Sequence, residues 1–539
     1  MSFRTITTAA VLTAASLAVV TAATTTSAAA SSTEPAGDDV VRVDGGLVRG
    51  QIDADHVTFS GIPYAAPPVG ERRWAPPSPA DPWTDVRDAT TPAAACAQLG
   101  SDDDGAPVVT GSEDCLYLNV TAPRGAPSAA PRPVLVWSYG GGFVSGSGSD
   151  YDATRLATTG DLVVVTINYR LGALGFLSSP ALDAPGHVSG NVALEDQAAA
   201  LQWVQRNAAA FGGDPANVTL AGQSAGARAV CAHLASPASQ GLFQRAIVQS
   251  GACVNEVVTK PVADDRGALA TAEVGCAETA DVAACLRSLP VDELLTTLPG
   301  GRTSVTGRIS DDPWGPVAGT PFLPNQPGAA IADGSAADVP LLVGSTRNEM
   351  RPFVGFRYDA AGNPLTDVDY EAAIVDAFGD DAPAVLAEYP AADYPSPALA
   401  LATVVGDWGG AIGSCPTLRT AEAAAGHAPV FAYEFAEDSG LVFEGFALGA
   451  YHGWDLPFAW DVSITGGGYP ELTVAQRVLS AQVIDHWASF ARSGDPNAAG
   501  RTPWPQFRSG TDTVLSLSVA SIATTPFSAT HRCDFWAAI

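Results

Sequence analysis

Continuous apolar segments alternate along the chain with segments whose apolar residues recur at helical spacing. Six segments rich in β-branched residues predict strands at 133–139, 161–170, 217–222, 245–251, 339–345 and 429–435. Several are apolar throughout, which is typical of strands covered on both faces. After the second, Leu194, Ala198, Leu201, Val204 and Ala208 predict one apolar stripe on a helix. This alternation predicts an α/β protein with a mostly parallel sheet and right-handed crossovers.

The chain beyond its first 40 residues or so shows no linker and no internal repeat. We therefore expect residues 40–539 to form a single elaborated α/β domain. Two stretches rich in Gly and Pro, 296–330 and 355–400, are expected to be irregular insertions around a functional site.

The N-terminal segment has the features of an export signal. Arg4 precedes a short, alanine-rich apolar stretch, and small residues at Ala23 and at 28–30 suit a signal peptidase. We expect residues 1–30 to be a secretory signal peptide, cleaved between about 23 and 30. No later stretch reaches about 18 uninterrupted apolar residues, so we expect a secreted, extracellular protein without a stable membrane anchor.

Acidic residues outnumber basic ones by 57 to 27, which gives a formal net charge of −30. This charge repels a phosphate backbone or an anionic membrane, so no nucleic-acid partner is expected. The simplest interpretation is a solvated acidic surface that keeps an exported protein soluble. A neutral or weakly cationic substrate is consistent with the same charge.

All eight cysteines lie beyond the expected signal peptide, and export makes disulfides their default state. Eight cysteines allow 105 pairings, so the residues alone leave the pairing open. The chain contains no C-x-x-C pair and no H-E-x-x-H motif, so we expect no metal site and no cofactor. The cysteines are Cys96, Cys115, Cys231, Cys253, Cys276, Cys285, Cys415 and Cys533.

The strongest chemical motif is G-x-S-x-G at residues 222–226, which places Ser224 directly after a predicted strand and before a helical pattern. A turn sharp enough to expose the serine needs the space that Gly222 and Gly226 leave. The alternative is that Ser224 only caps the following helix.

A second glycine run supports the nucleophile interpretation. The strand at 134–139 leads into Gly140, Gly141 and Gly142, whose bare backbone can approach a substrate carbonyl oxygen. Alone, this run could be an ordinary flexible loop. Together with the N–H group of Ala225, it predicts an oxyanion hole.

On such a sheet the catalytic residues follow the order serine, acid, histidine. His452 lies on a loop after a core strand, whereas His427 precedes a strand, His486 lies in a helical pattern and His531 is near the C-terminus. We therefore predict His452 as the base. Glu349 is the first carboxylate after the strand at 339–345 and is the predicted acid. Its competitors are Asp311, Asp312 and Asp407.

These motifs, in their order, resemble those of the type-B carboxylesterase and cholinesterase family of α/β-hydrolases. The resemblance covers nearly the whole chain after the signal segment and includes GIPYAAPPVGERRW (61–74), EDCLYLNV (113–120), NYRLGALGFL (168–177) and HGWDLPF (452–458). It implies an α/β-hydrolase fold, with a mostly parallel central sheet flanked by helices and long insertions around the active site. It also implies a secreted serine carboxylesterase that hydrolyses small-molecule carboxylic esters through a Ser-His-Glu triad and an acyl-enzyme.

The resemblance assigns roles to individual residues. Ser224 would be the nucleophile, Glu349 the acid and His452 the base. It implies the bridges Cys96–Cys115, Cys276–Cys285 and Cys415–Cys533, and a structural ion pair between Arg73 and Glu113. Cys231 and Cys253 lie outside the pattern but flank the helix after Ser224 and the next strand, so we predict a fourth bridge. The oxyanion donors would be Gly141, Gly142 and Ala225.

Two departures from the family pattern bear on the pH profile and on the substrate. Gln223 stands where relatives often carry a glutamate, which removes a negative charge beside the nucleophile. The segment between Cys96 and Cys115 has no tryptophan to hold a quaternary ammonium by cation–π attraction, so choline esters are disfavoured. A lipase acting on longer acyl chains is the main alternative, and a non-catalytic adhesion module on the same fold is a weaker one. We expect a monomer.

Overall fold

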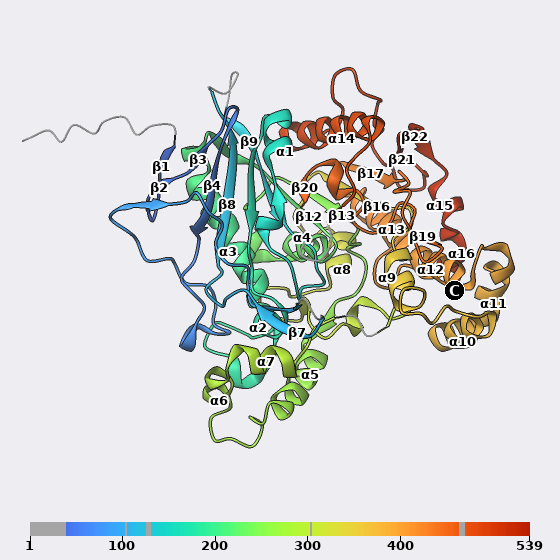
Figure 1. Cartoon of the computed structure of the whole chain (residues 1–539), viewed down its shortest axis with the longest axis horizontal. Helices are drawn as coiled ribbons and strands as arrows, with labels where there is room; N and C mark the ends of the chain where they lie inside the picture. Colours follow the sequence, from blue (N-terminus) through green and yellow to red (C-terminus); the bar gives the residue numbers. More distant parts are fainter. Residues whose placement is uncertain (1–38, 103–104, 126–130, 302–303, 463–468) are drawn as a thin grey trace, which may run out of the picture. The chain divides into compact units, whose positions relative to one another are not determined.

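The computed structural model describes residues 39–102, 105–125, 131–301, 304–462 and 469–539 (Figure 1). The expected signal peptide, residues 1–30, lies outside the described residues. Residues Asp38–Ile539 form one compact unit.

The centre of this unit is an 11-stranded sheet whose seven middle strands are parallel. Each of the six predicted strands overlaps one of them. The seventh, β21, escaped prediction because it has only four residues, one of them a serine. In spatial order the seven are β21 (Val514–Leu517), β17 (Val430–Phe435), β16 (Leu341–Thr346), β13 (Arg245–Gln249), β12 (Gly213–Gln223), β9 (Arg132–Ser138) and β11 (Val163–Ile167).

Antiparallel strands close the two edges of the sheet. Beside β11 lie β8 (Tyr117–Pro123), β4 (His56–Pro63) and β3 (Gln51–Ile52). Beside β21 lies β22 (Ile522–Thr525). The two outermost strands are short, which limits the open edge available for pairing with another chain. The fold is thus an α/β-hydrolase sheet, parallel in its middle and antiparallel at its margins.

Two groups of helices pack on the sheet. In one, α3 (Val192–Asn207) and α4 (Ala225–Ala235) contact each other and β12. In the other, α1 (Thr154–Gly160) and α14 (Val474–Ser493) contact each other, and α14 contacts β9. Every residue of β9 is buried, so both faces of this strand are covered. Helix α4 of the first group and α14 of the second both contact β9, which places the two groups on opposite faces of the sheet. The apolar stripe predicted for α3 is buried against this core.

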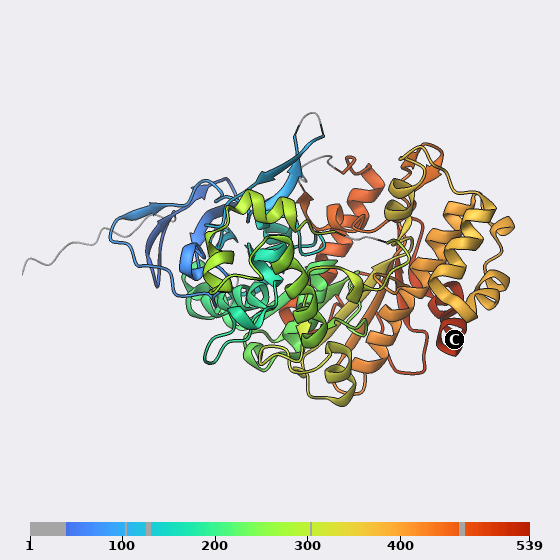
Figure 2. The same cartoon turned by 90° about the horizontal axis from the view of Figure 1, so that it is seen from below.

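The insertions form helical groups beside the sheet (Figures 1 and 2). One contains α5 (Lys260–Glu273), α6 (Val282–Ser288) and α7 (Val291–Thr297), at the bottom of Figure 1. The other, on the right of Figure 1, contains α9, α10, α11 and α12. Their bounds are Arg351–Arg357, Asp367–Phe378, Ala382–Glu388 and Pro397–Trp408.

The prediction that 355–400 is irregular was therefore wrong. Helix α10 begins where the Thr366 hydroxyl accepts from the backbone N–H of Asp369, and α12 begins where Ser396 accepts from Leu399. These helix-start signals were present in the sequence. The other stretch, 296–330, is largely irregular and leads into α8 (Pro327–Asp333).

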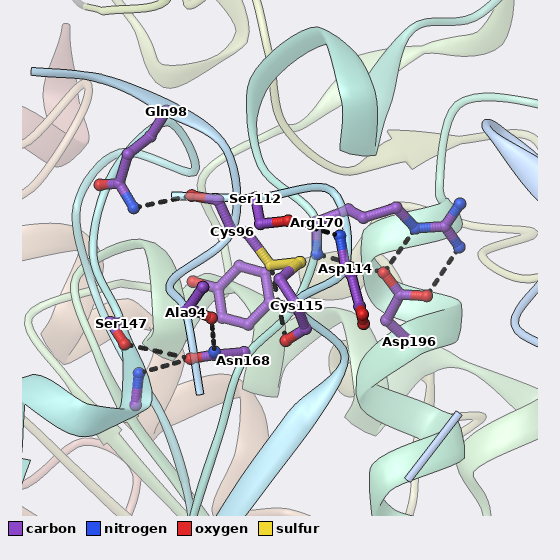
Figure 3. The surroundings of a disulfide bond; sticks show 12 residues. Ala94, Cys96, Gln98, Ser112, Asp114, Cys115, Ser147, Asn168, Arg170 and Asp196 are labelled. Atoms are coloured by element: carbon purple, nitrogen blue, oxygen red, sulfur yellow. Dashed lines mark hydrogen bonds and ion pairs between the residues drawn. A yellow bond between two sulfur atoms is a disulfide. The ribbon is translucent and has the colours of Figure 1, made fainter. Parts of the chain in front are cut away.

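Four disulfides tie the loops to this framework: Cys96–Cys115, Cys231–Cys253, Cys276–Cys285 and Cys415–Cys533. They include the three pairs that the resemblance implied and the fourth pair predicted from position. Figure 3 shows Cys96–Cys115 beside the buried ion pair of Arg170 with Asp196.

The ion pair expected between Arg73 and Glu113 is present and bidentate. Its two hydrogen bonds measure 2.6 and 2.7 Å. Arg73 also donates to the carbonyl of Leu289 at 2.8 Å. The pair therefore fastens the α5–α7 region to the N-terminal part of the chain.

Candidate active site

Ser224 occupies the turn between β12 and α4, at the carboxyl end of the central strand. Its φ of 58° and ψ of −123° are unusual for a residue with a side chain. A Cβ on Gly226 would lie 2.0 Å from the carbonyl oxygen of Ser138, and one on Gly222 would lie 2.5 Å from Gly226. Only glycine fits at these two positions, as the motif predicted.

Ser224 precedes α4 but its side chain makes no capping hydrogen bond. The alternative of a simple helix cap therefore does not describe its hydroxyl. The side chain instead lines a cavity of about 450 Å³. This position leaves the hydroxyl available for chemistry.

Glu349 and His452, 103 residues apart in sequence, meet beside this cavity. Glu349 follows β16, and the backbone N–H of Thr346 donates to its Oε1 at 2.7 Å. Its Oε2 lies 2.5 Å from Nδ1 of His452. Because a carboxylate accepts hydrogen bonds, Nδ1 carries the hydrogen and Nε2 carries the lone pair of a neutral imidazole. Glu349 is almost fully buried, at 1% exposure, so its orientation is fixed.

The other candidate histidines lie elsewhere. His452 is the histidine that lines the cavity among the residues the structure describes. Nδ1 of His486 lies 2.7 Å from the carbonyl oxygen of Pro496, and Nε2 of His427 lies 3.1 Å from that of Ala332.

His531 and Asp407, both weighed as triad members, form a separate buried cluster. Nδ1 of His531 lies 2.6 Å from Asp407, and Nε2 lies 2.8 Å from Glu434. Burial alone would disfavour the charged ring, but the two carboxylates outweigh it and raise the pKa of His531 to about 9. A histidine that stays protonated near neutral pH cannot serve as a general base there, so this cluster has a structural role.

The glycine loop lies directly against the serine. A Cβ on Gly140 would lie 2.9 Å from the Cβ of Ser224. Gly141 and Gly142 have φ values of 108° and 63°, and both line the cavity. The structure therefore brings the predicted donor loop next to Ser224 and Ala225.

Gln98 was not identified from the sequence, yet it holds the end of this loop. Its Oε1 accepts from the backbone N–H of Gly146 at 2.8 Å. Its Nε2 donates to the carbonyl of Cys96 at 2.9 Å (Figure 3). The Cys96–Cys115 bridge thus anchors Gln98, and Gln98 anchors the glycine loop. A glutamine two residues after a bridged cysteine gives no recognisable signal in the sequence.

Asp455 is a second buried carboxyl near the histidine, also not identified beforehand. Its Oδ2 accepts from Gln249 at 2.8 Å. Burial, together with a smaller contribution from the nearby charge of Glu349, raises the pKa of Asp455 to about 6. Only its position three residues after His452 could have drawn attention to it.

The cavity wall is mixed in character. Trp314, Phe353, Ile412 and Leu456 give it an apolar surface. The charged residues of the described lining are Asp150, Arg228 and Asp312. The described lining thus combines apolar and charged groups, as small-molecule cavities commonly do.

The parallel sheet, the strained serine turn and the meeting of Glu349 with His452 define an α/β-hydrolase. The carboxylesterase family profile matches residues 37–536, and the chain belongs to this family. It is a carboxylic ester hydrolase.

The relatives agree with this assignment. The chain is 35% identical to a cocaine esterase of Oryctolagus cuniculus over 498 residues, which cover 86% of this chain and 89% of the relative. It is 36% identical to a fumonisin B1 esterase of Sphingopyxis macrogoltabida over 476 residues, which cover 86% of this chain and 83% of that relative. The solved structure of a PNB esterase superposes with a TM-score of 0.76 at 33% identity. The superposition covers 92% of this chain and 99% of the PNB esterase chain. Because these relatives are esterases, the alternative of a non-catalytic module is disfavoured.

None of the helices in the described part of the chain is long and apolar enough to span a membrane.

Proposed function

We propose that this chain is a secreted serine carboxylesterase in which Ser224 attacks the ester, His452 moves the proton and Glu349 holds the imidazole. The observation that carries the proposal is that Ser224 and His452 line one cavity while Glu349 binds the far side of the ring. The sequence order of the three residues agrees with the order on this fold.

The acylation step follows from the positions of the groups. Nε2 of His452 takes the hydroxyl proton of Ser224 as the oxygen attacks the ester carbonyl. The imidazolium then passes this proton to the departing alcohol oxygen. Glu349 keeps Nδ1 protonated and stabilises the transient charge. Water attacks the acyl-enzyme by the same route and releases the carboxylic acid.

The negative oxygen of the tetrahedral intermediate is assigned to the backbone N–H groups of Gly141, Gly142 and Ala225. Gly141 and Gly142 lie on the loop that packs against Ser224, and Ala225 begins α4. The positive end of the α4 dipole adds to this stabilisation. Each well-placed donor contributes about 3 kcal/mol to the transition state.

Secretion is part of the proposal and rests on two features. The first 30 residues have the composition of an export signal, and all eight cysteines are paired. N-terminal sequencing of the protein recovered from the culture medium tests this part.

Labelling with a fluorescent alkyl phosphonate tests the catalytic assignment. Such a probe reacts with an activated serine, so the wild-type protein should be labelled at one site, and peptide mapping should identify Ser224. Pretreatment at 95 °C should abolish the labelling, because the geometry requires the folded chain. Labelling at another residue, or none on folded protein that cleaves no ester, contradicts the proposal.

A further inference from the structure

Arg228 lies one helical turn beyond Ser224 on the same face of α4. Its backbone N–H donates to the carbonyl oxygen of Ser224 at 3.1 Å. Helical side chains lean toward the N-terminus of their helix, so a side chain four residues after the serine extends back toward it. Arg228 accordingly lines the same cavity as Ser224.

The guanidinium group contacts Phe143 and Asp312 among its neighbours. It lies over the ring of Phe143, with 5.3 Å between its central carbon and the ring centroid. Its Nη1 lies 3.9 Å from Oδ2 of Asp312. Arg228 as a whole is only 6% exposed. A charge so far removed from water is costly, and the ring and Asp312 are among the groups that offset this cost.

The position of Arg228 relates it to one part of the substrate. The departing alcohol oxygen must lie near His452, which gives it a proton. The acyl carbonyl oxygen must lie near the glycine loop, and Phe143 directly follows Gly142 in that loop. The acyl substituent is the third group on the ester carbon, and we assign it to the part of the same cavity that Arg228 and Asp312 line.

We infer that Arg228 selects esters whose acyl group ends in a carboxylate, such as half-esters of short dicarboxylic acids. The inference rests on the proposed function, since it concerns the acyl side of the same site. A guanidinium carries five N–H groups in a planar fork, so it can bind a substrate carboxylate while remaining beside Asp312. An apolar acyl chain offers it no such partner.

The net charge of −30 favours a neutral or cationic substrate at long range, and Asp150 adds a second carboxyl to the lining. Salt screens the surface charge beyond about 8 Å at physiological ionic strength. Direct contact with Arg228 is not screened in this way, because the guanidinium is buried. The contact therefore decides the selectivity inside the cavity.

Three ethyl esters of equal acyl length test the inference. Monoethyl glutarate ends in a carboxylate, ethyl glutaramate in a neutral carboxamide and ethyl 5-aminopentanoate in an ammonium group. The kcat/KM of each is measured for the wild type and for Arg228→Met, Arg228→Lys and Asp312→Asn. Arg87→Met is the matched control, since Arg87 also lies over an aromatic ring, that of Trp83, outside the cavity lining. p-Nitrophenyl butyrate reports the basal esterase activity of every variant.

The wild type should favour the carboxylate ester over the carboxamide by about tenfold or more, the usual range for a hydrogen bond to a charged group. Arg228→Met should bring this ratio near one. Arg228→Lys should keep part of it, because lysine retains the charge without the fork. Asp312→Asn should raise it, because a competing carboxylate is removed. Arg87→Met should leave it unchanged.

Three results would overturn the inference while leaving the esterase function intact: a wild-type preference for the ammonium ester, an unchanged ratio in Arg228→Met, or a ratio lowered alike in Arg228→Met and Asp312→Asn. The last would mark Arg228 and Asp312 as a purely structural pair. Failure of the wild type to cleave any ester, with no phosphonate labelling, would overturn the proposed function and this inference together.

Discussion

Nε2 of His452 lies 3.2 Å from the side-chain nitrogen of Gln223, the residue that precedes the nucleophile. Because Nδ1 is committed to Glu349, Nε2 holds the lone pair and accepts a hydrogen bond from the Gln223 amide. Gln223 thus helps to orient the imidazole of His452 beside the cavity. In the proposed mechanism this lone pair takes the Ser224 proton instead, and such contacts often tighten only in the substrate complex.

Gln223→Glu should move the acidic limb of the kcat/KM profile to higher pH, by about one unit. A carboxylate beside Nε2 favours the protonated imidazole, which cannot act as a base. The basic side of the profile should change little. The measurement is kcat/KM for p-nitrophenyl butyrate between pH 4.5 and 9. Gln202→Glu is the control, because Gln202 is exposed on α3 and lies outside the cavity lining. An unchanged acidic limb in Gln223→Glu would show that another group controls it.

Ser224→Ala should reduce turnover by up to about a millionfold if the triad acts as a unit. The melting temperature should stay near that of the wild type, because the hydroxyl makes no capping bond. Rates with p-nitrophenyl butyrate and circular dichroism provide the two measurements. Ser521→Ala, at an exposed position, is the control and should retain full activity. Substantial activity in a well-folded Ser224→Ala would assign the nucleophile to another residue.

An acyl-length series separates the esterase from the lipase alternative. The cavity of about 450 Å³ contains Arg228 and Asp312, which are unfavourable neighbours for a long alkyl chain. We therefore expect kcat/KM on p-nitrophenyl esters to be higher for butyrate than for decanoate or longer chains. Rates rising steadily to palmitate, with activation at an emulsion surface, would instead favour a lipase.

The sequence was sufficient to predict the parts of the site whose geometry is local. Gly222 and Gly226 are needed wherever a serine must stand on so tight a turn, so their spacing revealed Ser224. His452 was selected because it follows a predicted strand. In a parallel sheet, the residues that follow the strands lie together at the carboxyl edge of the sheet. Arg228 and Gln98 were not foreseen, because their contacts depend on how distant loops pack. His531 was ambiguous for the same reason: only the fold shows that Asp407 and Glu434 enclose it.

The His531 cluster should make stability depend on pH in a defined window. The pKa of His531 is raised to about 9, against about 6.5 for an unfolded chain. Its stabilisation is therefore complete below about pH 6.5 and is lost as the pH rises through about 9. With a raised pKa of this size the loss should be roughly 2 to 4 kcal/mol.

Denaturant unfolding of the wild type and of His531→Gln at pH 6 and pH 9.5 measures this effect. The variant should be much less stable than the wild type at pH 6, and the difference should narrow at pH 9.5. His427→Gln is the control, because His427 is exposed and its ring lies at hydrogen-bond distance from the carbonyl oxygen of Ala332. An equal difference at both pH values would show that the charge of His531 does not contribute.

The Cys415–Cys533 bridge should contribute more stability than Cys276–Cys285, although both are single covalent links. It closes a loop of 118 residues, against 9 for the other. The entropy lost by the unfolded chain grows with loop length, which predicts about 5 kcal/mol for the longer loop and about 2.5 kcal/mol for the shorter. The double alanine variants at each pair, unfolded in denaturant without reductant, give the two values. Cys533 also begins α16 (Cys533–Ala538), which contacts α12 and α13, so early loss of this C-terminal helix should accompany removal of the longer bridge. Equal losses from the two variants would show that loop closure does not govern their contributions.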